Sequence, residues 1–264
     1  MLAEWFRHLT TPCPTHLKKM GYLKELIAIE ARHGRQRAAW ASHLEACKKL
    51  ILEAADAVKP GRVAVLGSGL LLDVPLRELS EKFSDVRLVD IFHMPAVEKR
   101  VAGLANVRLV TADLTGLAEA TFAHVNEGRT GALPSPEIDA GIVADCDLVV
   151  SLNLLTQLPL LPMGWVQENS PAYDEDALRS FARGIVDHHL EFLLSLPGRV
   201  CLITEKQRAI CDGGDVLQEI DPLFGSELRA AQIKRWTWNI APRPEINRHI
   251  DLSFRMAGIA DLKG

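Results

Sequence analysis

The stretch RVAVLGSG, residues 62–69, decides the fold of this chain. Its centre is apolar without polar alternation, which is typical of a strand buried on both faces of a parallel sheet. Gly67 and Gly69 follow directly, and glycine lets a backbone turn sharply and approach a ligand closely. The start of a following helix favours carboxylate or phosphate groups. Residues 62–69 therefore predict the first strand of an α/β sheet that ends in a ligand-binding loop.

Four further apolar runs have the texture of buried strands and alternate with helical segments. The runs are VRLVDI (86–91), NVRLVTADL (106–114), DLVVSL (147–152) and GRVCLITE (198–205). Helices are expected at 73–83, 95–103, 116–127 and 173–196, with Asp73 as a cap of the first. Apolar strands that alternate with helices predict a parallel sheet covered on both faces.

Both ends of the chain depart from this alternation. IKRWTWNI (233–240) and HIDLSFRM (249–256) have no helix between them, so they must pair antiparallel, and a helix is expected before them at 215–224. Residues 15–58 predict one long helix or two shorter helices. The predicted fold is a doubly wound, mostly parallel sheet of about seven strands with a C-terminal antiparallel hairpin. Residues 1–60 are expected to form an N-terminal helical extension or lid, and residues 61–264 a Rossmann-like domain.

Composition narrows the function classes. The 264 residues are 48% hydrophobic and 24% charged, which excludes a disordered tail, a collagen-like fibre and a coiled-coil rod. A net charge of −4 argues against a broad basic face, so no nucleic-acid partner is expected. The five cysteines form no CxxC pair, so neither a metal site nor a disulfide is expected. No apolar run reaches about 18 residues, so no membrane partner is expected and the protein is expected in the cytoplasm.

The residues that end the predicted strands are the candidate site. In a doubly wound sheet the ligand binds outside the carboxyl ends of the strands, where the strand order reverses. Asp90 ends the second strand, 23 residues after Gly67, which suits a carboxylate that accepts hydrogen bonds from ribose hydroxyls. Asp113 ends the third strand, where an acid can accept from an exocyclic amine. Alternatively, both acids simply cap the turns or helices that follow them.

This order of strands, strand ends and C-terminal hairpin resembles the class I S-adenosylmethionine-dependent methyltransferases, from about Arg62 to Met256. The resemblance implies S-adenosylmethionine as the cofactor. It implies that the loop Gly67, Ser68 and Gly69 passes under the methionine and ribose, that Asp90 binds ribose, and that Asp113 with Leu114 contacts the adenine amine. Ser151 and Asn153, which end the fourth strand, are added to this cofactor set because the segment after them borders the transferred methyl group in the family.

Two positions depart from the family pattern. Leu71 stands where a third glycine is usual, and Val65 stands where an acid usually helps to hold the cofactor's amino group. Another group must then hold this ammonium, or the cofactor binds weakly. A nicotinamide site fits less well, because its glycine pattern needs a glycine in place of Leu72. The remaining alternative is a non-catalytic binding or scaffold protein that has lost cofactor chemistry.

The acceptor side is less specific. The segment LPLLPMGW (158–165), with its two prolines, predicts an apolar lid and therefore a small, partly apolar substrate. Three residues are candidates for a general base, if the acceptor must lose a proton: His43, Asp145 and Glu205. Arg37 is the predicted cation for the cofactor's carboxylate, since it shares a helical face with Trp40. The oligomeric state is not predicted.

Overall fold

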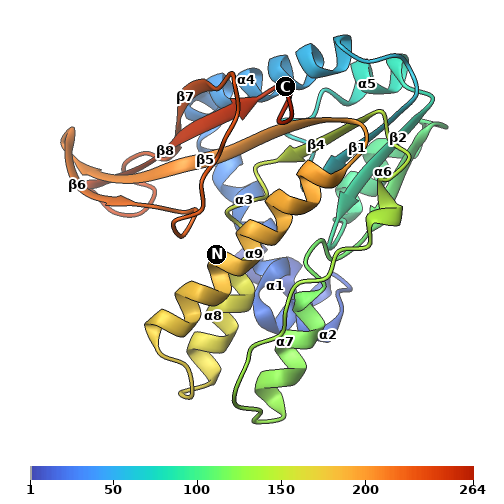
Figure 1. Cartoon of the computed structure of the whole chain (residues 1–264). Helices are drawn as coiled ribbons and strands as arrows, with labels where there is room; N and C mark the ends of the chain where they lie inside the picture. Colours follow the sequence, from blue (N-terminus) through green and yellow to red (C-terminus); the bar gives the residue numbers. More distant parts are fainter. Residues whose placement is uncertain (1) are drawn as a thin grey trace.

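The computed structural model describes residues 2–264, and Figure 1 shows a central sheet between helical layers. The strands are β1 (Arg62–Leu66), β2 (Asp85–Asp90), β3 (Val107–Thr111), β4 (Leu148–Leu152), β5 (Arg199–Asp212), β6 (Asp215–Ile220), β7 (Lys234–Ala241) and β8 (Ile250–Ile259). Their order in the sheet is β3-β2-β1-β4-β5-β8-β7, with β6 paired to β5. The pairs among β1 to β5 are parallel, whereas β8 is antiparallel to β5 and β7. The predicted fold class is confirmed.

Alternate residues of the central strands face opposite helical layers. Val63 and Val65 of β1 belong to the apolar core under α4 (Arg37–Asp56), α5 (Leu76–Lys82) and α6 (Pro95–Val101). Ala64 and Leu66 belong to the core under α9 (Glu175–Ser195). A strand packed on both faces has no place for polar alternation, which explains the continuous apolar run at residues 63–66.

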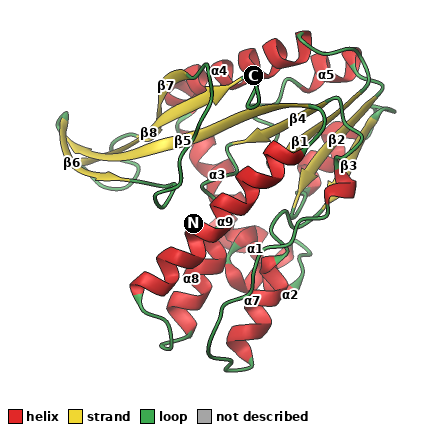
Figure 2. Cartoon of the chain, viewed as in Figure 1, coloured by secondary structure: helices red, strands yellow, loops and turns green. Residues whose placement is uncertain are grey.

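The N-terminal segment contains more helices than the sequence predicts. Beyond α1 (Leu2–Thr10), residues 15–58 form α2 (Thr15–Met20), α3 (Tyr22–Arg35) and α4. Gly21, with a φ of 98°, separates α2 from α3, and Gln36, with a φ of −112°, separates α3 from α4. Figure 2 shows α1 and α2 gathered with α7 (Leu117–Asn126) and α8 (Leu160–Asn169) beyond one edge of the sheet. Residues of α4 pack in the same apolar core as the sheet. The expected boundary between an N-terminal extension and a second domain at residue 60 stays a prediction.

The helix expected at residues 215–224 is wrong. Residues 215–220 form β6, which pairs antiparallel with the distal half of β5 and makes the long hairpin at the left of Figure 1. Gly213 and Gly214 have φ values of 59° and 102°, and this left-handed pair forms the tight turn that brings Asp212 opposite Asp215. The glycine pair was the sequence signal for this hairpin.

The remaining short element is a 3-10 helix at Ala140–Ile142, before β4. Among residues 2–264, no helix has the combined length and apolar character that crossing a membrane requires.

Candidate functional site

A cavity of about 510 Å³ lies at the carboxyl ends of the parallel strands. Residues of α3 and α4 and the hairpin strands β7 and β8 complete its walls. Most of the residues predicted from the sequence line it together: His43, Gly67, Ser68, Gly69, Asp90, Asp113, Leu114, Asn153 and Glu205. The strand-end argument therefore finds the place, although it does not assign the role of each residue.

The glycine loop has one glycine needed for packing and one that borders open space. A Cβ at Gly67 would lie 2.9 Å from the Cβ of Leu154, so this glycine allows the loop to pack. A Cβ at Gly69 would meet only the carbonyl oxygen of Gly67, at 3.9 Å. Leu71 has a φ of 59°, the left-handed conformation that glycine adopts most easily. The loop therefore keeps its backbone shape despite the missing third glycine.

Asp90 ties the end of β2 to this loop. Its Oδ2 accepts a hydrogen bond from the backbone N–H of Gly69 at 2.7 Å, and its Oδ1 accepts from the N–H of Ile91 at 2.8 Å. Burial raises the pKa of this carboxyl, and the bond from Gly69 opposes the rise. Each carboxylate oxygen has a second lone pair, so Asp90 can still accept a bond from a ligand in the cavity.

Asp113 has the capping role that the sequence left open. Its Oδ1 accepts from the backbone N–H and the hydroxyl of Thr115, at 2.9 and 2.7 Å. Its Oδ2 accepts from the backbone N–H of Ala118, in the first turn of α7, at 2.8 Å. Asp113 also lines the cavity, next to the buried Leu114. Capping and ligand contact are therefore compatible at this residue.

Asp73 is a site residue that the sequence analysis placed wrongly, as a helix cap. The N-cap of α5 is Pro75, without a side-chain cap. The carboxylate of Asp73 lines the cavity instead, and its Oδ2 accepts a bond from Nδ2 of Asn153 at 2.8 Å. Burial raises the pKa of Asp73, opposed by the bond from Asn153. The signal was an acid four residues after Gly69, within the same loop.

Asn153 leaves one acceptor unused beside this acid. Its Oδ1 is buried and has no hydrogen-bond partner. Its φ of 50° places it in the left-handed region directly after β4, which turns the chain away from the regular strand. Asp73 and Asn153 together offer a carboxylate and an amide oxygen to a group that donates several hydrogen bonds.

His43 does not have the geometry of the predicted general base. Its Nδ1 accepts a bond from the indole N–H of Trp236 at 3.0 Å, and its ring stacks on Trp238 with centroids 3.9 Å apart. Indole only donates, so in the neutral ring the proton is on Nε2. Burial lowers the pKa of His43 to about 3, which keeps the ring neutral. The remaining acceptor for Nε2–H is Sγ of Cys47 at 3.5 Å, because Nδ2 of Asn153, 3.3 Å away, also donates. His43 takes up no proton near neutral pH.

The same tautomer makes a metal site unfavourable at the cluster of His43, Cys47 and Asp73, whose ligand-type atoms lie within 4.8 Å of one another. The Sγ of Cys47 lies 3.5 Å from the protonated Nε2 of His43. Burial raises the pKa of the Cys47 thiol, so that this group also keeps its proton. Metal ions bind thiolate and unprotonated imidazole nitrogen. Of this cluster, His43 and Asp73 line the cavity, and the buried Cys47 lies against His43.

Three predicted site residues do not line the cavity: Asp145, Ser151 and Arg37. Asp145 precedes β4, at the opposite end of the strand, and its carboxylate pairs with Arg87 at 2.6 Å and with Arg62 at 3.1 Å. Its role as a base is therefore corrected to a surface ion pair. Ser151 lies inside β4, and its hydroxyl meets Nε2 of His189 on α9 at 3.1 Å. Successive strand residues face opposite sides, so Ser151 points to the α9 layer.

Arg37, the predicted cation, is absent from the cavity wall, whereas Arg32 forms part of it. Arg37 begins α4 and is exposed, although Trp40, three residues later in the same helix and expected on the same face, is buried. Arg32 of α3 lines the cavity, with its Nε 3.6 Å from a carboxylate oxygen of Glu245. That Nε is buried without a hydrogen-bond partner. The guanidinium of Arg32 is therefore only loosely paired.

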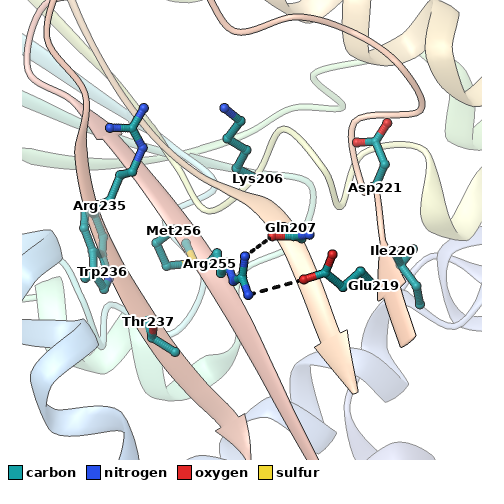
Figure 3. A pocket seen from close by; sticks show the side chains of 10 residues that line it. All are labelled: Lys206, Gln207, Glu219, Ile220, Asp221, Arg235, Trp236, Thr237, Arg255 and Met256. Atoms are coloured by element: carbon teal, nitrogen blue, oxygen red, sulfur yellow. Dashed lines mark hydrogen bonds and ion pairs between the residues drawn. The ribbon is translucent and has the colours of Figure 1, made fainter. Parts of the chain in front are cut away.

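A second hollow, of about 740 Å³, lies on the strands β5, β6, β7 and β8 rather than at strand ends (Figure 3). Arg255 crosses it, with a hydrogen bond of 2.7 Å to Gln207 and an ion pair of 3.3 Å to Glu219. In Figure 3, Lys206 and Arg235 extend away from this pair. None of the predicted site residues lines this hollow. The 510 Å³ cavity is therefore the candidate functional site.

No protein-family model matches the chain, and no curated protein matches it. Among solved structures, it is similar to the Burkholderia thailandensis 1,6-didemethyltoxoflavin-N1-methyltransferase with bound 1,6-didemethyltoxoflavin and S-adenosylhomocysteine. The identity is 16%, the match covers 95% of this chain and 93% of that chain, and the TM-score is 0.43.

Two further matches are also methyltransferases. The N-methyltransferase NodS from Bradyrhizobium japonicum WM9, in complex with S-adenosylhomocysteine, is 11% identical over 97% of this chain and 96% of that chain, with a TM-score of 0.34. The 23S rRNA methyltransferase ErmE is 13% identical over 82% of this chain and 70% of that chain, with a TM-score of 0.31. The fold itself follows from the strand order of the sheet.

Proposed function

We propose that this protein binds S-adenosylmethionine in the 510 Å³ cavity and transfers its methyl group to a small, partly apolar molecule. The observation that carries the proposal is that one cavity is lined by the glycine loop and three acids, Asp73, Asp90 and Asp113. When bound, S-adenosylmethionine supplies a methyl group already activated by the positively charged sulfur. The protein then has to hold two ligands in the right orientation, which is a large part of catalysis in such reactions.

The residues at the ends of β1, β2 and β3 suit the adenosine part. Gly69 borders open space where a ligand can lie against the backbone. Asp90 has remaining lone pairs for the two ribose hydroxyls, and it is held in place by the N–H of Gly69. Asp113 and Leu114 are proposed to meet the adenine ring, with Asp113 fixed by its bonds to the start of α7.

The methionine part of the cofactor has an ammonium and a carboxylate, and the cavity offers an acid and an arginine for them at positions that differ from the usual family pattern. Its ammonium donates three hydrogen bonds, and Asp73 with the free Oδ1 of Asn153 supplies acceptors beside the loop. This arrangement replaces the acid missing at Val65. Arg32 supplies a loosely paired guanidinium for the carboxylate, and a guanidinium grips two oxygens at once.

The rest of the cavity wall is mainly apolar, which suits the acceptor. The apolar side chains that line it include Leu26, Ile29, Leu44, Leu160, Leu161, Ile240, Leu252 and Phe254. Such a wall excludes water and favours an acceptor with an apolar body. The lid expected from residues 158–165 contributes Leu158, Leu160 and Leu161 to this wall.

A non-catalytic scaffold is the alternative, and it was motivated by Val65 and Leu71. Leu71 keeps the left-handed backbone that a glycine would have, and Asp73 supplies an acid to the same cavity. Both departures thus have a compensation in the structure, which favours ligand binding.

The test is thermal unfolding with S-adenosylhomocysteine. At about 100 times its Kd, the ligand should add roughly 2.7 kcal/mol to the free energy of unfolding. Asp90→Ala should weaken binding by about 1.5–3 kcal/mol, as expected for loss of a charged hydrogen-bonding group. A folded wild-type protein that shows no binding by calorimetry would refute the proposal.

A further inference from the structure

Glu205 and Arg208 form an ion pair in the cavity wall that the proposed cofactor contacts do not use. Glu205 is only 4% exposed, and its Oε1 accepts a bond from an Nη of Arg208 at 2.5 Å. A bulge in β5 between Glu205 and Gln207 breaks the regular pairing with β8. Both Glu205 and Arg208 line the cavity, at the point where β5 leaves the parallel part of the sheet.

Half of this pair is unsatisfied. The Oε2 of Glu205 and the Nε of Arg208 are both buried and have no hydrogen-bond partner. Arginine and carboxylate groups often form two parallel bonds, but only one bond joins them here. A buried acceptor and a buried donor without partners are unfavourable, so a group that satisfies both should bind strongly. A hydroxyl group does so with a single oxygen, since it donates one hydrogen bond and accepts others.

The neighbouring side chains favour an aromatic ring on that hydroxyl. The guanidinium carbon of Arg208 lies 4.9 Å from the ring centroid of Phe254. Phe254 meets Trp238 edge to face, with centroids 5.7 Å apart and planes at 87°. Phe254, Trp238 and the apolar Leu252 all line the cavity. Aromatic rings prefer such offset and edge-to-face neighbours.

We propose that Glu205 and Arg208 bind the hydroxyl of a phenolic methyl acceptor, an inference that rests on the proposed function. Oε2 of Glu205 accepts the hydroxyl proton, and Nε–H of Arg208 donates to the hydroxyl oxygen. A phenol has a pKa of about 10, so it needs a base at neutral pH. An oxygen lone pair forms the new O–CH₃ bond, the electrons of the S–CH₃ bond stay on sulfur, and the proton goes to Glu205 and then to solvent.

The test is calorimetry with two probes of similar size on protein saturated with S-adenosylhomocysteine. One probe, 2-naphthol, carries the hydroxyl, and the other, 2-fluoronaphthalene, lacks a donor. We expect 2-naphthol to bind tighter by about tenfold or more, because a site built for a hydroxyl rejects an analogue without it. Glu205→Gln should reduce this ratio to about threefold or less. Glu219→Gln is the matched control, since Glu219 pairs with Arg255 in the other hollow.

Each outcome supports or overturns the role of Glu205 and Arg208 in binding a hydroxyl. Equal binding of the two probes to the wild type, or binding of neither, overturns the assignment, and this comparison needs no variant that might fail to fold. An unchanged ratio in a folded Glu205→Gln protein overturns it as well. Absence of S-adenosylhomocysteine binding to the wild type, measured in a separate titration of the ligand-free protein, refutes the proposed function itself. Cofactor binding without discrimination between the probes refutes only the role of Glu205 and Arg208.

Discussion

Asp73→Asn removes the negative charge that we place against the cofactor's ammonium, while it keeps the size of the side chain. Asp73 lines the cavity, and its Oδ2 lies 2.8 Å from Nδ2 of Asn153. A hydrogen bond to a charged group contributes about 1.5–3 kcal/mol. Since about 1.4 kcal/mol corresponds to tenfold in Kd, S-adenosylhomocysteine should bind roughly 10- to 150-fold more weakly.

The free protein should behave in the opposite way. Burial raises the pKa of Asp73, so the folded state binds a proton more tightly than the unfolded state does. Stability therefore falls as pH rises from the unfolded pKa through the folded pKa, and the ionised carboxylate remains unfavourable at neutral pH. Asparagine has no such ionisation. We expect Asp73→Asn to unfold at the same temperature as the wild type or higher, although it binds the ligand less well.

The assay is calorimetric titration with two ligands. S-adenosylhomocysteine carries the amino-acid part, and 5′-methylthioadenosine lacks it, so only the first should lose affinity. Asp56→Asn is a matched control, because Asp56 is exposed at the end of α4 and pairs with Lys82. Equal losses for the two ligands would mean that the substitution distorts the cavity. An unchanged affinity for S-adenosylhomocysteine would refute the role of Asp73 in ammonium binding.

Three further predictions follow from the same geometry. Gly67 and Gly69 both have positive φ values, 76° and 50°, so alanine should cost stability at either position. Gly67→Ala should lower the unfolding temperature more, because its Cβ would also lie 2.9 Å from Leu154, whereas the Cβ at Gly69 enters open space and should mainly weaken the binding of S-adenosylhomocysteine. A larger loss of unfolding temperature in Gly69→Ala, or unchanged ligand affinity in that variant by calorimetry, would contradict this. Arg32→Ala should weaken the binding of S-adenosylhomocysteine more than that of 5′-methylthioadenosine, and substitution of the exposed Arg37 by alanine should affect neither. Equal affinities of the two variants for S-adenosylhomocysteine by calorimetry would exclude Arg32 as the partner of its carboxylate. Burial lowers the pKa of His189 to about 3, so the unfolded state gains a proton below about pH 6.5 that the folded state does not, and stability should fall as pH drops toward 3. His189→Gln should reduce this loss of unfolding free energy at acid pH by up to about 1.4 kcal/mol per pH unit. Urea unfolding at pH 7 and pH 5 measures it, and an equal loss in the wild type and the variant would contradict a role of His189 in acid unfolding.

The short-range pattern of the sequence was enough for the parallel sheet and for the place of the site. Apolar runs buried on both faces need no tertiary information to be recognised, and parallel strands bring their carboxyl ends to one edge. This is why Gly67, Asp90, Asp113 and Asn153 were predicted to lie together and do so. Glu205 ends the predicted fifth strand, so the same reasoning placed its carboxylate at this edge, and it lines the same cavity.

Backbone conformation at single residues decided what the strand pattern left open. A break at Gln36 separates α3 from α4, and Arg32 of α3 lines the cavity while Arg37 at the start of α4 is exposed. The left-handed pair Gly213 and Gly214 turns a predicted helix into the β6 hairpin. Breaks of this kind depend on a few dihedral angles, whose choice is made by packing against distant residues as well as by local preference.

The surroundings of the candidate site residues depended on tertiary contacts. Asp73 reads in the sequence as a helix cap, and only the approach of Asn153, 80 residues later, makes it a cavity carboxylate. His43 reads as a candidate base, yet Trp236, 193 residues away, donates to its Nδ1 and burial keeps it neutral. The sequence alone determined the sheet and the edge at which the site lies, because these follow from local hydrophobic patterns. The protonation and the partner of each side chain were decided by the tertiary structure, because they depend on burial and on groups that are distant along the chain.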